Sequence, residues 1–185
     1  MTYRQSALFR LVEVAEKILA NEIGPIEGAR KISELRVDVG DPDNEVFTRF
    51  SGIDSESDDL VVGNRALWSE AFVQEVDRRY EANEQVLRPD IADDCRALLA
   101  VLSRRLHECP VCGFTGSDRL PYDAAGTPSY ETCASCGFEF GVTDVMEYDF
   151  AEWRRRWIPD GMPFRRPPAP PGWDPVAQMN AAQVS

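Results

Sequence analysis

Apolar residues recur every three or four positions through most of the first hundred residues, which is the spacing of amphipathic helices. The first such stretch predicts a helix over residues 5–22, with one apolar face made of Leu8, Leu11, Val12, Ala15, Ile18 and Leu19. Gly24 is expected to end this helix, and Pro25 lies where the first turn of a helix tolerates proline. A second helix is therefore predicted from Ile26 to near Arg36.

Two longer helices are predicted after a less regular stretch. Asn64 can cap a helix over residues 65–86, and Asp90 can cap another that reaches Leu106 and carries the cleanest apolar stripe of the chain. Pro89 lies between them, and since proline breaks a helix, the two are expected to pack as an antiparallel pair. Residues 1–107 are thus predicted to form an α-helical domain, a bundle of about four helices.

Residues 38–63 are expected to be irregular and rich in acids. Alternating acids suggest a calcium loop, but a loop that begins at Asp41 places Val46 where the sharp turn requires glycine, and Gly52 where a bidentate glutamate belongs. We therefore interpret the segment as a solvated acidic surface loop or a patch that faces a partner. The candidate partner-binding residues are Asp54, Glu56, Asp58 and Asp59.

The chain changes character at residue 108, where glycine, proline, cysteine and aromatic residues become frequent. Residues 109–114 and 133–138 both read C-x-x-C-G-F, and this pair of knuckles at this separation has the sequence form of a zinc ribbon. The expected cofactor is one structural Zn²⁺ per chain, with Cys109, Cys112, Cys133 and Cys136 as its ligands. Two disulfides or a redox pair are the alternatives. A small antiparallel β module is expected over residues 108–142.

One further helix and a tail complete the predicted architecture. Asp144 and Glu147 can form a reciprocal cap for a helix that ends near Trp157, within a segment 143–158 expected to pack on the ribbon. Arg154, Arg155 and Arg156 lie in its last turn, where cations complement the helix dipole. Residues 159–185 are rich in proline and are predicted to be an extended tail, which Trp173 can anchor.

Composition and charge narrow the possible functions. The 185 residues carry a net charge of −12, which disfavours binding to a phosphate backbone. No apolar run reaches the roughly 20 residues of a bilayer span, and the N-terminus lacks the apolar core of a secretory signal, so a cytoplasmic protein is predicted. His107 is the sole histidine, and no nucleophile or nucleotide motif is present, so we expect no enzymatic activity. Cys95 falls on a helical apolar stripe and is predicted to be buried.

The second half resembles the bacterial cysteine-rich CPCC domain over about residues 108–180. The resemblance rests on the two knuckles, on Pro121-Tyr122-Asp123 and Pro128-Ser129-Tyr130-Glu131 between them, and on Trp153, Trp157 and Trp173 after them. Ala134 and Ser135 replace the middle of the second knuckle, which in that family usually reads Cys-Pro-Cys-Cys. The front half is similar to uncharacterised bacterial helical proteins, through residues 27–32 and 52–58.

These resemblances imply a function, because families of both kinds tend to be encoded beside bacterial polymorphic toxins and are suspected immunity proteins. The first hypothesis is a non-enzymatic immunity protein that occludes a cognate toxin. The second is a zinc-ribbon regulator or nucleic-acid accessory factor that uses Arg154, Arg155 and Arg156. The third is an enzyme with a carboxylate-based site.

Overall fold

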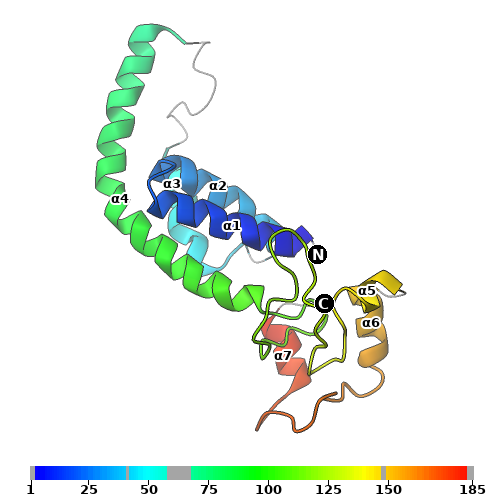
Figure 1. Cartoon of the computed structure of the whole chain (residues 1–185). Coiled ribbons are helices and arrows are strands. Elements are labelled where there is room, and N and C mark those ends of the chain that lie inside the picture. Colours follow the sequence, from blue (N-terminus) through cyan, green and yellow to red (C-terminus); the bar gives the residue numbers. More distant parts are fainter. Residues whose placement is uncertain (1–2, 41, 58–67, 147–148, 183–185) are drawn as a thin grey trace. The chain divides into compact units, whose positions relative to one another are not determined.

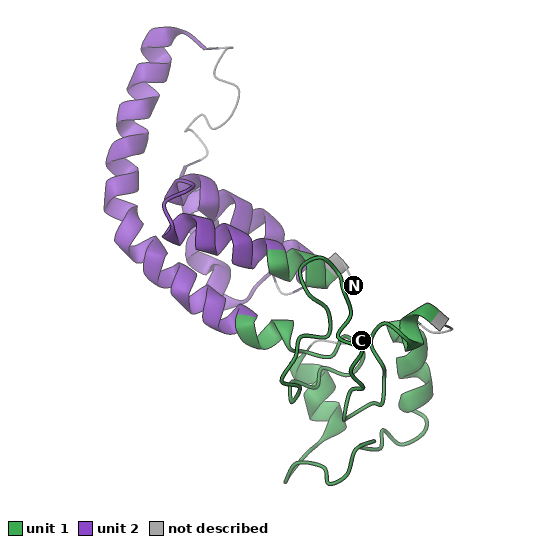
Figure 2. Cartoon of the chain, viewed as in Figure 1, with its two compact units in different colours: residues 1–9, 103–185 green, residues 10–102 purple. Residues whose placement is uncertain are grey.

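The computed structural model describes residues 3–40, 42–57, 68–146 and 149–182, and it is mainly helical. The chain divides into two compact units (Figure 2). Residues 10–102 form the helical unit, and residues 1–9 together with 103–185 form the cysteine-containing unit. Helices α1 and α4 each contribute residues to both units. None of the helices among the described residues combines the length and the apolar character that a membrane crossing requires.

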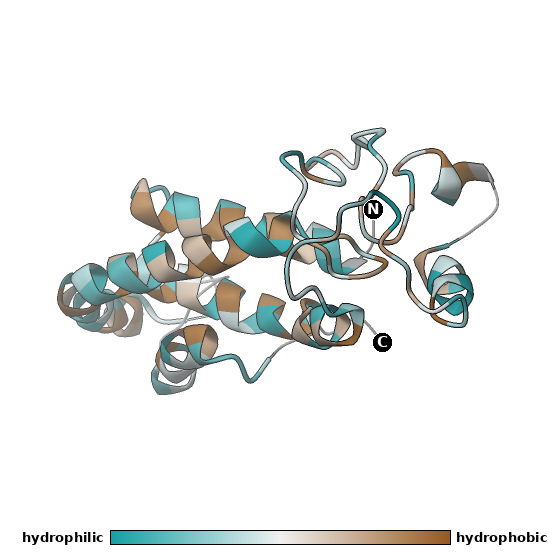
Figure 3. Cartoon of the chain, turned by 90° about the horizontal axis from the view of Figure 1, so that it is seen from below, coloured by the Kyte–Doolittle hydropathy of each residue, from teal (hydrophilic) through white to brown (hydrophobic). Residues whose placement is uncertain are grey.

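The first two predicted helices are confirmed as α1, Tyr3–Leu19, and α2, Pro25–Asp38 (Figure 1). Pro25 occupies the first turn of α2, as expected. Gly28 lets the two helices approach closely, because a Cβ atom at this position would meet the Ile18 side chain at 2.4 Å. Hydrophobic and hydrophilic residues alternate around the helices (Figure 3). The buried hydrophobic residues of α1 and α2 in this unit are Leu11, Ala15, Ile18, Ile26, Ala29, Ile32 and Leu35.

The segment expected to be an irregular acidic loop contains two short helices instead. A 3-10 helix, Glu45–Phe47, begins with the side chain of Asn44 accepting a hydrogen bond from the Val46 N–H, and it leads directly into α3, Thr48–Glu56. Phe47, Phe50 and Ile53 are buried, and their spacing of three residues is helical. The density of acids concealed this short period, so the prediction of an irregular loop was wrong for residues 45–56.

A single 37-residue helix, α4, Glu70–Leu106, replaces the predicted antiparallel pair. Pro89 lies inside it and is exposed to solvent. The helix continues because the apolar stripe stays in phase across the proline, with Val76 buried before it and Ile91, Cys95, Leu98 and Leu102 buried after it. Figure 1 shows that α4 bends partway along its length, as a helix with an internal proline does. The predicted cap Asn64 lies outside the described residues.

Pro89→Ala is expected to stabilise the protein by about 1–2 kcal/mol. Alanine removes the penalty of proline inside a helix, but it also returns conformational entropy to the unfolded chain, which offsets part of the gain. The residue is exposed, so alanine leaves the packing intact. Urea unfolding followed by circular dichroism at 222 nm measures the change. Gln85→Ala, at another exposed position of α4, controls for helix propensity alone. A gain no larger than that of the control would contradict the prediction.

The cysteine-containing unit holds little regular structure apart from the ends of α1 and α4 and three short helices. These are α5, Thr143–Met146, α6, Phe150–Trp157, and α7, Pro175–Ala181. The predicted small β sheet is absent from the described residues, where two isolated antiparallel bridges join Tyr122 to Pro128 and Thr132 to Glu139. The antiparallel pairing is short because the second knuckle turns the chain between Cys133 and Phe138, whose backbones share a hydrogen bond.

Two boundaries in this unit also differ from the predictions. The helix predicted from Asp144 to Trp157 is divided into α5 and α6, and α6 is capped by Asp149, whose side chain accepts a hydrogen bond from the Glu152 N–H. Asp144 instead accepts hydrogen bonds from the Tyr122 hydroxyl at 2.5 Å and the Gly141 N–H at 2.7 Å. Its predicted partner Glu147 lies outside the described residues.

The tail predicted to be extended contains a helix. Helix α7 begins with Asp174, which accepts hydrogen bonds from the N–H groups of Val176 and Ala177, and Pro175 occupies its first turn. The Trp173 indole N–H donates to the Gln178 side chain at 2.8 Å. Local capping residues thus override the proline-rich composition.

Candidate metal centre

The two C-x-x-C-G-F sequences fold into two knuckles with the same backbone hydrogen bonds. In the first, the Cys109 N–H donates to the Phe114 carbonyl at 2.9 Å, and the Gly113 N–H donates to the Cys109 carbonyl at 2.8 Å. In the second, the equivalent bonds join Cys133 to Phe138 at 2.8 Å and Gly137 to Cys133 at 2.9 Å.

The glycine at the fifth position of each knuckle is required by the backbone. Gly113 and Gly137 have φ angles of 76° and 78°, a left-handed conformation that side chains disfavour. The repeated sequence therefore encodes one repeated turn.

The four cysteine sulfurs meet in a single cluster. All lie within 4.8 Å of one another, with Cys109 3.8 Å from Cys136 and Cys112 3.7 Å from Cys133. A Zn–S bond of about 2.3 Å places the sulfurs of a tetrahedral site about 3.8 Å apart. None of the four cysteines forms a disulfide. The residues thus fit a tetrahedral metal ion, and the structure brings together all four predicted ligands.

Burial and charge also favour a cation at this cluster. The cysteines are at most 5% exposed, and burial raises the pKa of Cys109 and Cys136 above the ordinary range of a thiol. Hydrogen bonds from the neighbouring thiols lower the pKa of Cys133, as does the backbone N–H of Cys136. Burial therefore disfavours thiolates at Cys109 and Cys136 unless a nearby cation compensates their charge. A divalent cation would supply the positive charge that four thiolates need.

The knuckles are held by side chains that bond to their backbone carbonyls. Arg154, in α6, donates from Nε to the Val111 carbonyl at 2.8 Å and from Nη2 to the Pro110 carbonyl at 3.1 Å. The Trp153 indole N–H donates to the Cys136 carbonyl at 3.0 Å, and Gln178 of α7 donates to the Cys112 carbonyl at 2.8 Å.

An aromatic core encloses this arrangement. Its buried aromatic residues are Tyr122, Phe138, Phe140 and Trp157. The cluster can hold a metal ion, and because the four sulfurs fill a tetrahedral shell and are buried, it offers no ligand position to a substrate.

Arg154, Arg155 and Arg156 do not form one basic surface. Arg154 is 9% exposed and bonded to the first knuckle, whereas Arg155 and Arg156 are exposed. All three were predicted to complement the helix dipole or to bind a partner, whereas the support that Arg154 gives to the knuckle was not predicted. Helical spacing could have indicated this role. Arg154 lies three residues before Trp157 and therefore on the same face of the helix, which is the buried face.

Two further candidate residues, His107 and Cys95, do not belong to the four-cysteine cluster. His107 Nδ1 is 3.2 Å from the Ser117 carbonyl oxygen, in a contact that follows the end of α4. Cys95 is fully buried in α4, as predicted, and burial raises its pKa to about 12.

The predicted acidic surface is only partly described. Asp54 in α3 is half-buried, and its carboxylate lies 3.9 Å from Arg30 Nε, while Glu56 is exposed. Arg30 also donates to the carbonyl of Ser57. Asp58 and Asp59 lie outside the described residues. Within α3, Glu56 thus faces solvent, whereas Asp54 interacts with its own chain.

Comparisons with known proteins add one distant relative. The chain matches no protein-family model and no solved structure. It is 26% identical over 78 residues to a protein of Bacillus subtilis (strain 168) named uncharacterized protein YoaQ, and the match covers 34% of this chain and 66% of that protein. The chain thus spans just under two thirds of that relative's length. The cysteine cluster is the feature of the CPCC-type resemblance that the geometry supports.

Proposed function

We propose that this protein is a non-enzymatic protein-binding protein, an immunity protein that neutralises a bacterial toxin by occluding it, and that one structural Zn²⁺ holds its cysteine-containing unit together. The enclosure of four sulfurs at tetrahedral spacing supports the structural-zinc part of this proposal. A four-thiolate site of this kind suits zinc or iron, and a closed shell serves folding rather than catalysis.

Metal analysis of the purified protein tests the zinc directly. We expect one zinc per chain by inductively coupled plasma mass spectrometry, together with four thiols that resist alkylation until a chelator is added. Cys95 serves as an internal reference, because its burial does not depend on metal. A protein that is folded and free of metal, or one that contains iron, would overturn the structural-zinc proposal.

The partner proposal is supported by charge. A net charge of −12 repels nucleic acid at long range and favours a partner with a basic surface. Glu56 is the exposed candidate for that contact, while Asp54 is engaged by Arg30. In a cytoplasmic location, which we also propose, the thiols would remain reduced and available to the metal.

The partner test combines rescue with binding. Expression of the full chain is expected to restore growth to cells that produce its cognate toxin, and Glu56→Lys should weaken the purified complex about tenfold and reduce its salt dependence. Glu13→Lys, an exposed acid in α1, is the matched control. Absence of rescue, combined with salt-sensitive binding to nucleic acid, would replace the proposal with the nucleic-acid alternative.

A further inference from the structure

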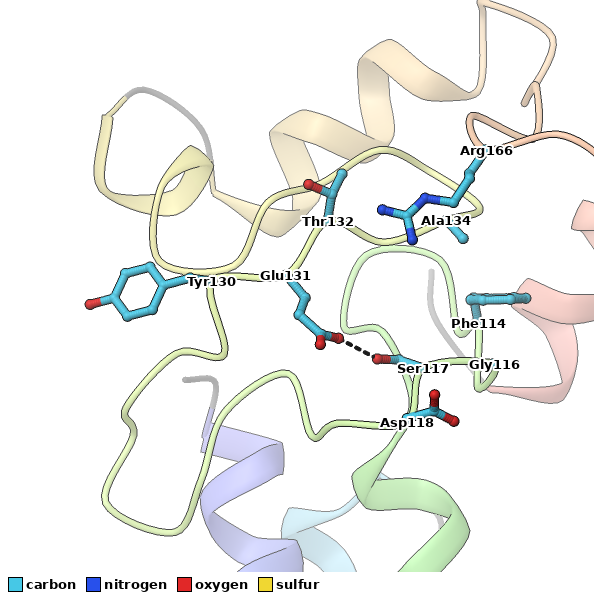
Figure 4. Close-up of a pocket in the computed structure, with 9 residues that line it drawn as sticks. All are labelled: Phe114, Gly116, Ser117, Asp118, Tyr130, Glu131, Thr132, Ala134 and Arg166. Atoms are coloured by element: carbon cyan, nitrogen blue, oxygen red, sulfur yellow. Dashed lines mark hydrogen bonds between the residues drawn. The ribbon is translucent and has the colours of Figure 1, made fainter.

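The cysteine-containing unit has a second structural feature, a surface pocket of about 420 Å³ lined by residues in and near the two knuckles (Figure 4). Its walls come from residues 114–118 after the first knuckle, from residues 130–134 leading into the second, and from Arg166 in the tail. Pockets that bind small ligands have volumes of about 300–1,000 Å³. The pocket is therefore large enough for a ligand the size of an amino acid or a short peptide.

Opposite charges line this pocket. Glu131, Asp118 and Arg166 are among its lining residues, and Figure 4 shows that Arg166 comes from a different segment than the two acids. In the part of the chain that the structure describes, Arg166 is joined to no acid by an ion pair. The pocket thus presents a cation and two anions whose charges do not neutralise each other by direct contact.

Hydrogen bonds hold the Glu131 carboxylate and the backbone of Arg166 in place. The Ser117 hydroxyl donates to the Glu131 carboxylate at 2.8 Å. This bond joins the segment after the first knuckle to the segment before the second and holds the Glu131 side chain. The Arg166 N–H donates to the Ala134 carbonyl at 3.0 Å, and the preceding Arg165 N–H donates to the Ser135 carbonyl at 3.0 Å. The tail that carries Arg166 is therefore bonded to the middle of the second knuckle.

One wall is apolar and depends on a glycine. The Phe114 ring packs edge-on against Phe164, with ring centroids 5.6 Å apart. A Cβ atom at Gly116 would lie 2.3 Å from that ring, so glycine at this position allows the ring to take its place in the wall. The pocket combines charged groups of both signs with a small apolar surface.

From these contacts we infer that the pocket binds a small zwitterion, with its carboxylate at Arg166 and its ammonium group at Glu131 and Asp118. A simple anion would meet two carboxylates and a simple cation would meet the guanidinium, whereas a zwitterion satisfies both signs. The ligand class is a free α-amino acid or a short peptide with free termini, which share this chemistry. The site is separate from the metal cluster and adds a ligand-binding activity to the proposed function.

Isothermal titration calorimetry on the zinc-loaded full chain tests the inference. The probes are L-alanine, L-glutamine, the dipeptide Ala-Ala and the uncharged N-acetyl-L-alaninamide. Binding of a zwitterion with no binding of the uncharged probe supports the site. The free amino acids and the dipeptide then distinguish the two sources of the ligand. If no zwitterion binds at concentrations up to about 10 mM, or if the uncharged probe binds equally well, the inference is overturned.

Variants confirm where the ligand lies. Arg166→Gln and Asp118→Asn should each weaken binding about tenfold, because each removes one charge-assisted contact. Arg155→Gln, an exposed arginine outside the pocket lining, is the matched control and should bind as the natural sequence does. Zinc content and near-ultraviolet circular dichroism establish that each variant is folded. Equal loss in the control, or full binding by both pocket variants, would contradict the assignment.

Discussion

Replacing Cys136 with serine is expected to remove the metal and to unfold the cysteine-containing unit. A serine hydroxyl is a poor substitute for a thiolate, so the ion keeps three of its four protein ligands. Structural zinc sites contribute about 10–16 kcal/mol of apparent binding free energy that is also folding free energy. The unit has few other elements to stabilise it, since its described backbone has three short helices and two isolated bridges besides the ends of α1 and α4.

Three measurements report this loss. Zinc content should fall from one ion per chain to nearly none, and the near-ultraviolet signal of the buried Trp157 should disappear. Trypsin should cut after the arginines of α6. The circular dichroism of the helical unit should persist, because residues 10–102 have a hydrophobic core of their own.

Cys95→Ala is the matched control for removing a buried cysteine. Cys95 lies in the core of the helical unit, so its truncation should cost about 1 kcal/mol through lost packing and leave the zinc content unchanged. If Cys136→Ser retained both the metal and the near-ultraviolet signal, the cluster would not be a metal centre. If Cys95→Ala lost the metal as well, general destabilisation would explain both results.

The cysteine cluster could be predicted from the sequence because each knuckle is specified by residues that are close together in the chain. Each knuckle is specified within six residues by two cysteines, a glycine with positive φ and a phenylalanine that closes the turn. The repetition of the C-x-x-C-G-F pattern then indicated that the two turns belong together. The structure places all four sulfurs at the distances of a tetrahedral site. The positions of the cysteines in the sequence could suggest this arrangement but could not show it.

Long-range packing limited the prediction of the helices. Pro89 was expected to divide α4, because proline removes a hydrogen bond and clashes with the preceding turn. The burial of Val76 on one side and Ile91 on the other shows that the apolar stripe crosses the proline in phase, and tertiary packing outweighs the local penalty. The helix α3 was missed for the opposite reason, since Phe50 and Ile53 carry its signal among many acids.

Supporting residues were harder to predict than ligands. Gln178 reaches the Cys112 carbonyl from α7, 66 positions away in sequence, and no pattern around Gln178 indicates this contact. Glu131 and Arg166 line one pocket because the backbone of the tail bonds to the second knuckle. This contact, like that of Gln178, has no pattern in the sequence that would predict it. Local sequence specifies the knuckles, whereas the contacts around them follow from the packing of distant segments.

Arg154→Gln is expected to destabilise the cysteine-containing unit by about 2–4 kcal/mol, the range for losing hydrogen bonds from a charged donor to buried carbonyls. Two such bonds reach Val111 and Pro110, between the two cysteines of the first knuckle. Glutamine is too short to replace both. The loss should appear in urea unfolding followed by tryptophan fluorescence, and zinc should transfer faster to a competing chelator because the first knuckle opens more often.

Two further variants separate the causes of this effect. Arg155→Gln removes the same charge from an exposed position of α6 and should change stability by no more than about 0.5 kcal/mol. Arg154→Lys keeps a positive charge beside the cysteines but cannot match the planar fork of the guanidinium, so it should fall between the natural sequence and Arg154→Gln. An Arg154→Lys variant as stable as the natural protein would show that charge alone matters. If Arg154→Gln behaved like Arg155→Gln, the bonds to the knuckle would contribute no net stability.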